Sequence, residues 1–196
     1  MRHFNSGSVF GRVIECKEEK TSKDKPYLSL KVQVSGEKSG SATAFCRIWG
    51  EERCREFLDL QKKNPGPLVL RGMMTSYRDD KNCFYSNFTC FSWEPKVAEP
   101  RAVFILRGEV DVVSGTTDGG QRMLLKVTRD AAEGYQESAE LFELFCQGEK
   151  MLDVVKIGDN LEVKGMVRQE EVDDFYGGGA GPVRSYVEQL KVMLPF

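Results

Sequence analysis

The stretch AFCRIWGEERCREFLDLQKK, residues 44–63, changes its hydrophobic period at Gly50. Before the glycine, small apolar residues at positions 44, 46 and 48 alternate with Phe45, Arg47 and Trp49. Such alternation is typical of a strand that buries one face and exposes the other. We therefore expect a strand whose outer face carries an aromatic ring, a cation and a second aromatic ring.

The residues after Gly50 follow the period of a helix instead. Cys54, Phe57, Leu58 and Gln61 recur at helical intervals in EERCREFLDLQKK, which begins with acids and ends with two lysines, as the helix dipole favours. The tract NPGP then ends the helix. We expect Gly50 to end the strand and to cap the helix, since glycine is accepted at an N-cap.

The same order of segments occurs twice in the chain. The first half runs VFGRVIEC, YLSLKVQV, ATAFCRIWG, EERCREFLDLQKK, LVLRGMM and CFYSNFTCFSW, and the second runs LRGEVDVV, MLLKVTR, ELFELFCQG, EKMLDVVK, LEVKGMV and VRSYVEQLKVM. Four landmarks match at separations of 93 to 98 residues: Gly11 with Gly108, Lys31 with Lys126, Gly50 with Gly148, and Gly72 with Gly165. Such regular spacing indicates two copies of one structural unit.

Each copy is predicted to contain five strands, with one short helix between the third and the fourth. This order within about 90 residues is that of the OB-fold, a five-stranded Greek-key barrel that binds oligonucleotides across one face. The prediction is a mainly β protein of two tandem OB-folds, OB-fold 1 over residues 1–97 and OB-fold 2 over residues 98–196. The tract EPKVAEPR, residues 94–101, is the expected linker.

Charge is distributed unequally between the two copies. Residues 1–97 contain 17 Lys and Arg against 12 Asp and Glu, a net charge of +5, whereas residues 98–196 contain 11 against 18, a net charge of −7. Because cations release counterions from nucleic-acid phosphates, the first copy is the better candidate for contact with a polyanion. Random drift of surface charge between two domains explains the asymmetry equally well.

Several function classes find no support in the sequence. The only histidine is His3, and no Cys/His pair, HExxH or GxSxG motif is present, so we predict a non-enzyme without catalytic residues. Six cysteines without a CxxC motif indicate free thiols in the core rather than a zinc site, and we predict neither a metal nor a cofactor. Short apolar runs and the absence of a signal sequence predict a cytoplasmic protein with no membrane contact.

The run IWGEERCREFLDLQKKNPGPLVLRGMM, residues 48–74, resembles a segment of bacterial single-stranded DNA-binding proteins. In that family, strand three ends in an aromatic residue and a glycine, a short helix follows, and strand four carries an apolar run that ends in glycine. VFGRV, residues 9–13, is similar to the first strand of the family. The resemblance covers residues 8–93 well and residues 103–193 less well, and it implies DNA binding in replication, recombination or repair.

The resemblance also implies an assembly. Members of the family are usually homo-oligomers that display four OB-folds, and some carry two per chain, so this chain is expected to form a homodimer. Most members end in an acidic tail that recruits partner enzymes, whereas this sequence ends in KVMLPF, where only Pro195-Phe196 resembles that tail. Binding of replication or repair proteins as partners is therefore an open expectation.

The outer face of the strand that ends at Trp49 is the candidate nucleic-acid interface. A sequence-tolerant protein meets the phosphates of a single strand with cations and its bases with aromatic rings. Phe45, Arg47 and Trp49 provide both kinds of group at intervals of about 7 Å. Neighbouring segments add the other candidates: Tyr27 and Lys31 from strand two, Arg71 from strand four, and Tyr77 and Arg78 from the loop before Asp79-Asp80. Structural burial is the alternative role of each ring.

The second copy differs at the matching positions. Alignment on Gly148 places Glu143, Phe145 and Gln147 where the first copy has its aromatic, basic and aromatic residues. A polyanion gains little from a carboxylate there, so OB-fold 2 is predicted to serve in oligomerisation or auxiliary binding. The leading prediction is sequence-tolerant binding of single-stranded DNA, and the alternatives are a tandem OB-fold module that binds protein partners or RNA.

Overall fold

The computed structural model describes residues 4–34, 42–81, 83–116, 120–129, 138–146, 153–169 and 183–193. The first half of the chain contains β1 (Phe4–Lys20), β2 (Pro26–Gln33), β3 (Thr43–Trp49), α1 (Glu51–Lys63), β4 (Leu68–Arg78) and β5 (Phe84–Pro95). The second half contains β6 (Arg101–Gly115), β7 (Gln121–Arg129), β8 (Ser138–Cys146), β9 (Asn160–Gln169) and β10 (Val183–Val192).

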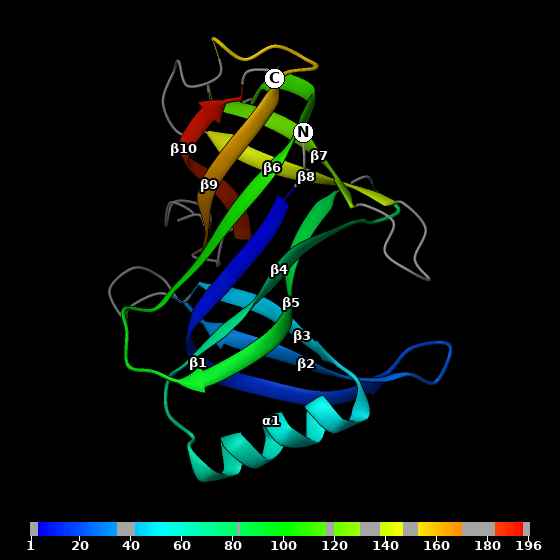
Figure 1. The fold of residues 1–196 in the computed structure, drawn as a ribbon, viewed down its shortest axis with the longest axis vertical. Coiled ribbons are helices and arrows are strands. Elements are labelled where there is room, and N and C mark those ends of the chain that lie inside the picture. The colour runs from blue at the N-terminus through cyan, green and yellow to red at the C-terminus, as the bar shows by residue number, and fades with distance from the viewer. Residues whose placement is uncertain are drawn as a thin grey trace, which may run out of the picture.

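The strands form two barrels stacked along the long axis of the molecule (Figure 1). They pair in the order β2-β3-β5-β4-β1-β6-β7-β8-β10-β9, and the additional pairings of β2 with β1 and of β6 with β9 close each set of five strands. The prediction of a mainly β protein with two tandem OB-folds is confirmed. The connecting segment is shorter than predicted, residues 96–100, because β5 continues to residue 95 and β6 begins at residue 101. Whether residues 1–97 and 98–196 fold independently stays a prediction.

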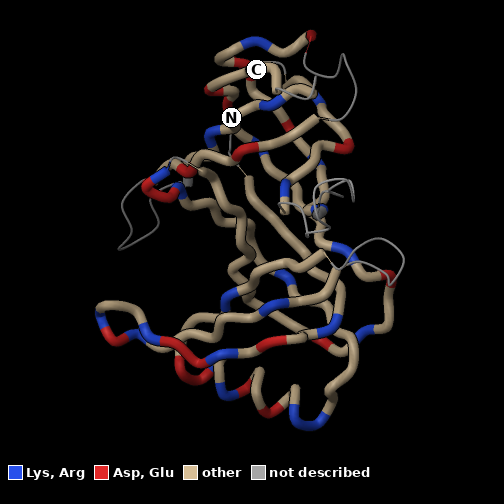
Figure 2. Tube along the Cα trace, turned by 180° about the vertical axis from the view of Figure 1, so that it is seen from behind, with Lys and Arg blue, Asp and Glu red and all other residues tan. Residues whose placement is uncertain are grey.

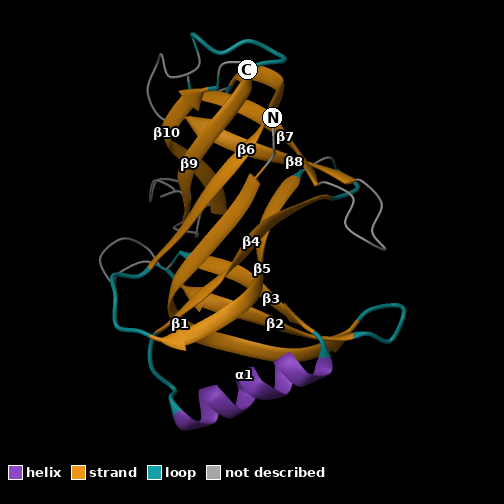
Figure 3. Ribbon diagram, in the orientation of Figure 1, coloured by secondary structure: helices purple, strands orange, loops and turns teal. Residues whose placement is uncertain are grey.

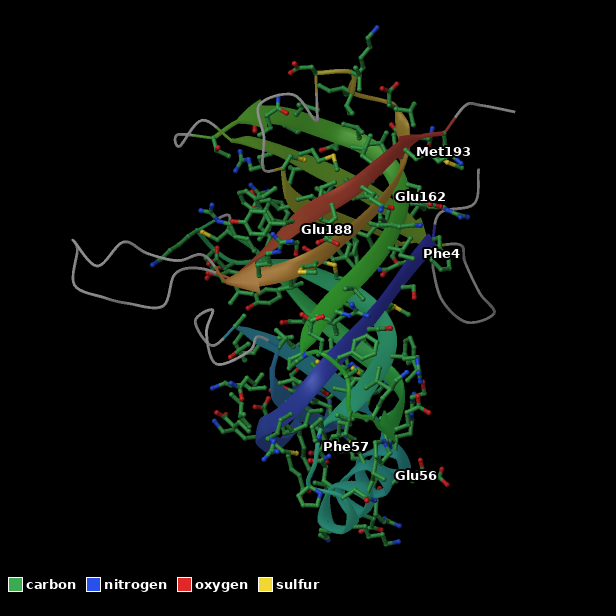
Figure 4. The ribbon with its side chains drawn as sticks, turned by 90° about the vertical axis from the view of Figure 1, so that its left-hand side faces the viewer. Phe4, Glu56, Phe57, Glu162, Glu188 and Met193 are labelled. Atoms are coloured by element: carbon green, nitrogen blue, oxygen red, sulfur yellow. The ribbon has the colours of Figure 1, made fainter. Side chains whose placement is uncertain are left out.

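The helix α1 closes the outer end of the first barrel (Figure 3). It spans the predicted residues, and Gly50 caps it with a backbone φ of 95°, a value that favours glycine. Phe57 is fully buried where α1 meets the strands, whereas Glu56 points away from the barrel (Figure 4). Acidic residues in the first turn and lysines in the last stabilise the helix through its dipole.

Matched glycines allow strands to approach closely at the same points of both barrels. A Cβ on Gly11 would lie 2.0 Å from the carbonyl oxygen of Gln33, and one on Gly108 would lie 2.4 Å from that of Lys126. The match of Lys31 with Lys126 is therefore wrong by two residues, since Gln33 is the structural counterpart of Lys126. Local composition could not reveal this register, because lysine and glutamine are both tolerated on the outer face.

A second pair of glycines marks the contact between the fourth and fifth strands of each barrel. A Cβ on Gly72 would lie 1.9 Å from the carbonyl oxygen of Thr89, and one on Gly165 would lie 2.1 Å from that of Tyr186. These contacts identify Thr89 and Tyr186 as equivalent residues of the two repeats. The sequence match of Gly72 with Gly165 is confirmed.

The two barrels are joined by antiparallel pairing of β1 with β6, in which Gly7 lies opposite Phe104. On their other sides, Gly7 lies opposite Gly72 and Phe104 lies opposite Gly165, so Gly7 and Phe104 hold equivalent positions. Equivalent residues that pair with each other define a pseudo-two-fold axis. Buried side chains of both barrels form one continuous hydrophobic cluster across this junction.

Complementary side chains flank the axis of the junction. Phe4 lies opposite Arg107 and Phe10 lies opposite Arg101, and the two guanidinium groups are 5.5 and 5.2 Å from the ring centres. Phe4 is at the end of β1 that lies against the second barrel (Figure 4). Both rings belong to β1 and both arginines belong to β6. If β6 paired in the same register with the β6 of another chain, Arg101 of each strand would lie opposite Arg107 of the other. Like charges opposite one another destabilise a strand pair, which favours pairing within the chain.

Two predictions about the second barrel and the thiols need correction. The second helix was expected over EKMLDVVK, of which residues 149–152 lie outside the described residues, and residues 153–156 form no helix. The cysteines were expected in the core, but Cys16 and Cys83 are exposed, whereas the other four are buried. Cys16 lies on β1 opposite Leu30, in a part of the strand where residues 16–20 are all exposed, and Cys83 lies just before β5.

We expect Gly72→Ala to lower the free energy of unfolding by at least about 1 to 3 kcal/mol, since the new methyl group collides with backbone that cannot move aside. Gly66→Ala is the matched control, because a Cβ there meets nothing within 4 Å, and its effect should stay within about 0.5 kcal/mol. Urea unfolding of both variants measures the difference. Equal stability of the two variants would show that the strands separate easily at Gly72.

Candidate nucleic-acid interface

The strands β1, β2 and β3 of the first barrel present one outer surface made of three cross-strand rows, here called the β1–β2–β3 face. From β3 through β2 to β1, the rows are Trp49, Tyr27 and Glu19; then Arg47, Ser29 and Lys17; then Phe45, Lys31 and Glu15. Five of the eight predicted site residues therefore lie together. The residues between them, Leu28, Leu30, Cys46 and Ile48, are buried in the barrel.

The aromatic residues of the face differ in their surroundings. Trp49 packs against Tyr27 with ring centres 4.6 Å apart and ring planes at 31°. The hydroxyl of Tyr27 donates a hydrogen bond to Glu19, and this bond raises the pKa of the tyrosine. Phe45 is 41% exposed and makes no ring contact within the described part of the chain. The face thus offers one supported pair of rings and one open ring.

The cations of the face fall into two kinds. The guanidinium of Arg47 lies 5.7 Å from the centre of the Tyr27 ring, and no carboxylate among the described residues pairs with it. Lys31 Nζ instead lies 2.7 Å from Glu15 Oε2, and Lys17 Nζ lies 2.6 Å from Glu15 Oε1. These hydrogen bonds, from Lys17 first and Lys31 second, lower the pKa of the Glu15 carboxyl group from 4.5 to about 2.

Tyr77 and Arg78 lie on β4 rather than in a loop, which corrects the prediction. The strands β4 and β5 continue as a long hairpin in which Tyr77 is opposite Tyr85 and Arg78 is opposite Phe84. The two tyrosine rings stack at 5.1 Å, and the Arg78 guanidinium lies 5.4 Å from the Phe84 ring centre. These cross-strand contacts between large side chains stabilise the extended hairpin.

The same hairpin reaches the second barrel. Both β4 and β5 contact β8, and β5 also contacts β10, where Ser185 Oγ lies 3.3 Å from Ser86 Oγ. Figure 1 shows β4 and β5 extending from the lower barrel toward the upper one. The hairpin that carries the aromatic pairs is therefore in contact with both barrels.

Arg71 is the predicted residue that the structure separates from the rest. It lies on β4 opposite Ser92 of β5 and Ser8 of β1, and β5 stands between β4 and β3. Its guanidinium is 2.6 Å from Glu94, whose pKa it lowers. Arg71 therefore belongs to another side of the barrel and has a carboxylate partner there.

Sequence reasoning missed the acidic border of the face and half of the hairpin cluster. Glu15, Lys17 and Glu19 alternate along β1, and this period of two was the available signal. Tyr85 follows Tyr77 across the turn at a spacing compatible with a hairpin. Figure 2 shows how both signs of charge follow one another along the β1–β2 hairpin.

The matching surface of the second barrel has a different composition. Phe145 lies opposite Tyr186 as Arg47 lies opposite Thr89, which confirms the alignment of Phe145 on Arg47. Gln147 and Gly148 lie outside the described residues. The guanidinium of Arg184 lies 4.5 Å from the centre of the Phe145 ring.

Charge on that surface is also paired. Glu143 accepts a hydrogen bond from Arg122 at 2.9 Å, and the side chain of Glu143 is only 16% exposed. Tyr186 is 7% exposed, and its ring centre lies 6.1 Å from that of Phe145. The second barrel thus has fewer open aromatic rings at the equivalent position.

The described residues contain neither a metal-binding cluster nor a membrane-spanning helix. Within them, no three His, Cys, Asp or Glu side chains are grouped so that they could hold a metal ion. The helix among them is not long and apolar enough to cross a membrane.

The fold and the position of the face define the class of protein by architecture: a tandem OB-fold chain. The structure of wild-type single-stranded DNA-binding protein from Thermus aquaticus is similar to it with a TM-score of 0.65 at 15% sequence identity, covering 100% of this chain and 96% of that one. A deletion mutant of the same protein gives a TM-score of 0.64 at 14% identity, with 100% and 97% covered. No family model matches the sequence, and no curated protein matches it. The likeness shows that the fold extends over the whole chain.

We expect the carboxyl carbon of Glu15 to titrate with a midpoint near pH 2 in a ¹³C NMR experiment. Because its pKa is lowered in the folded protein, the two ion pairs stabilise the fold above about pH 4.5 and lose this effect as the pH falls to about 2. Replacement of both Lys17 and Lys31 by alanine should return the midpoint toward 4.5. A midpoint near 4.5 in the unmodified protein would mean that the ion pairs do not form in solution.

Proposed function

We propose that the chain is a non-enzymatic protein that binds single-stranded DNA with little sequence preference, in replication, recombination or repair. One observation carries the proposal: the paired rings of Trp49 and Tyr27, the open ring of Phe45 and the cation of Arg47 share one exposed face of an OB-fold. The strands β2 and β3 are the part of an OB-fold that most often binds oligonucleotides.

Binding would use two chemical contacts that every single strand offers. Bases stack on aromatic rings whatever their identity, and phosphates attract cations. Trp49 and Phe45 lie on the same face four residues apart, on either side of Arg47. Tyr27 supports the Trp49 ring from β2, so a stacked base would meet a ring that is already held in place.

The β4–β5 hairpin is the second part of the proposed interface. Loops and hairpins between strands four and five commonly contribute to binding in OB-folds. Tyr77 and Tyr85 are 49% and 45% exposed, and Arg78 lies near them on β4. A strand bound along the β1–β2–β3 face could continue over these rings toward the second barrel.

We also propose a division of labour between the barrels. Residues 1–97 carry a net charge of +5 and residues 98–196 carry −7, and Glu143 occupies the position of Phe45. OB-fold 2 would therefore serve mainly in oligomerisation or auxiliary contacts. A homodimer would display four OB-folds, and exposed apolar residues such as Val154 and Ile157, each 70% exposed, are available to a partner. A cytoplasmic location and contacts with replication or repair proteins belong to the same proposal.

The proposal is tested by titration of the full chain with oligo-dT, oligo-U and duplex DNA while tryptophan fluorescence is followed. We expect quenching by oligo-dT, a site of about 4 to 16 nucleotides per engaged barrel, and an affinity that falls steeply with salt. Light scattering at the same concentrations gives the oligomeric state. Equal affinity for duplex and single strands would contradict the proposal, and a preference for oligo-U would favour an RNA-binding function.

Two aromatic substitutions separate the roles of the barrels. Trp49→Ala should weaken binding of oligo-dT by roughly 1 to 3 kcal/mol, the value of one base stack, and should leave the fold intact, with a loss of stability of at most about 1 kcal/mol from the contact with Tyr27. Phe145→Ala is the matched change in the second barrel and should lower stability more than affinity, since Phe145 packs against Arg184 and Tyr186. Equal losses of affinity in both variants would make the barrels equivalent DNA-binding modules.

A further inference from the structure

The β1–β2–β3 face holds a carboxylate next to the cations that would meet phosphate. Glu15 uses its two oxygens separately, Oε1 toward Lys17 at 2.6 Å and Oε2 toward Lys31 at 2.7 Å. Two of the three cations in the rows are therefore bound by one carboxylate. Arg47, the third, has no carboxylate partner in the described ranges.

The position of Lys31 makes this pairing important for binding. In its row, Lys31 stands between Glu15 on β1 and Phe45 on β3. A phosphate next to a base stacked on Phe45 would need the ammonium group that Glu15 already holds. The carboxylate also repels the phosphate directly, because it lies on the same surface.

The pair remains accessible to a competing anion. The side chains of Lys31 and Glu15 are 40% and 32% exposed, so solvent reaches both partners. Exposed ion pairs are weak, and phosphate can exchange with a carboxylate at such a site. Glu19, the other carboxylate of the rows, binds no cation among the described residues and instead accepts the hydrogen bond from the Tyr27 hydroxyl, which orients the tyrosine ring.

We propose that Glu15 attenuates the affinity of the face for single-stranded DNA mainly by holding Lys31, the lysine next to Phe45, so that Arg47 supplies the main phosphate contact of the rows. This inference rests on the proposed function and adds the residue that limits its strength. The attenuation is local, because it acts through an ammonium group that Glu15 touches and not through the net charge of the chain.

The test compares full-length variants that bind oligo-dT over a series of salt concentrations. Glu15→Gln removes the carboxylate charge and keeps the size of the side chain. Glu94→Gln is the matched control: it removes the same charge from an exposed ion pair, that of Glu94 with Arg71 at 2.6 Å, outside the rows. Lys31→Ala, alone and combined with Glu15→Gln, reports whether the effect passes through Lys31.

Glu15→Gln should bind about two- to fivefold more tightly, as expected for release of an exposed pair. Its plot of log affinity against log salt should steepen by about 0.7 for each cation released to phosphate. Lys31→Ala should weaken the unmodified protein only slightly and should abolish most of the gain in the double variant. Glu94→Gln should change the affinity by less than Glu15→Gln.

Three results would overturn the inference: an unchanged affinity of Glu15→Gln, an equal gain in Glu94→Gln, or a gain that persists without Lys31. Circular dichroism and thermal unfolding verify the fold of each variant, and Glu15→Ala must give the same direction as Glu15→Gln. If the unmodified protein binds no oligo-dT even at low salt, the proposed function fails instead.

Discussion

The antiparallel pairing of β1 with β6 is the constraint on which the other parts of the molecule depend. One strand, β1, pairs with β4 and β6 through residues 4–11 and with β2 through residues 12–20, and the β2 pairing has a register shift between Val13 and Glu15. Such an irregularity bends a strand from one sheet direction to another. The strand that joins the barrels therefore also forms the acidic border of the candidate interface.

The junction is nearly symmetric in backbone and asymmetric in side chains. The central pair illustrates this, since Gly7 in the first barrel corresponds to Phe104 in the second. A Cβ on Gly7 would lie 2.6 Å from the ring of Phe88, whereas the residue equivalent to Phe88 in the second barrel is Ser185. At this point next to the junction, each barrel thus buries one ring, Phe88 of β5 in the first and Phe104 of β6 in the second.

Opposite charges on the candidate interface distinguish it from a simply basic surface. Its rows combine three cations with two carboxylates, and each carboxylate has a specific contact. The matching surface of the second barrel also has a specific ion pair, between Arg122 and Glu143. Under the proposed function, such a surface would bind a polyanion through its rings and a small number of unpaired cations, and the affinity would depend on which ion pairs open. The electrostatic contribution to binding would then be set by individual contacts more than by the net charge of +5 in residues 1–97.

The sequence by itself determined most of the elements and their repetition, because the period of apolar residues reports whether a segment is a strand or a helix. It therefore predicted α1 with both ends, the two barrels, and a common face for Phe45, Arg47 and Trp49. Only the tertiary structure decided the register between strands. It showed that Gln33, and not Lys31, corresponds to Lys126, and that Tyr77 lies in an extended hairpin. It also placed Glu15 against Lys31, 16 residues away in the chain. Register depends on hydrogen bonds, bulges and close approaches between distant strands, and local periodicity carries no information about them.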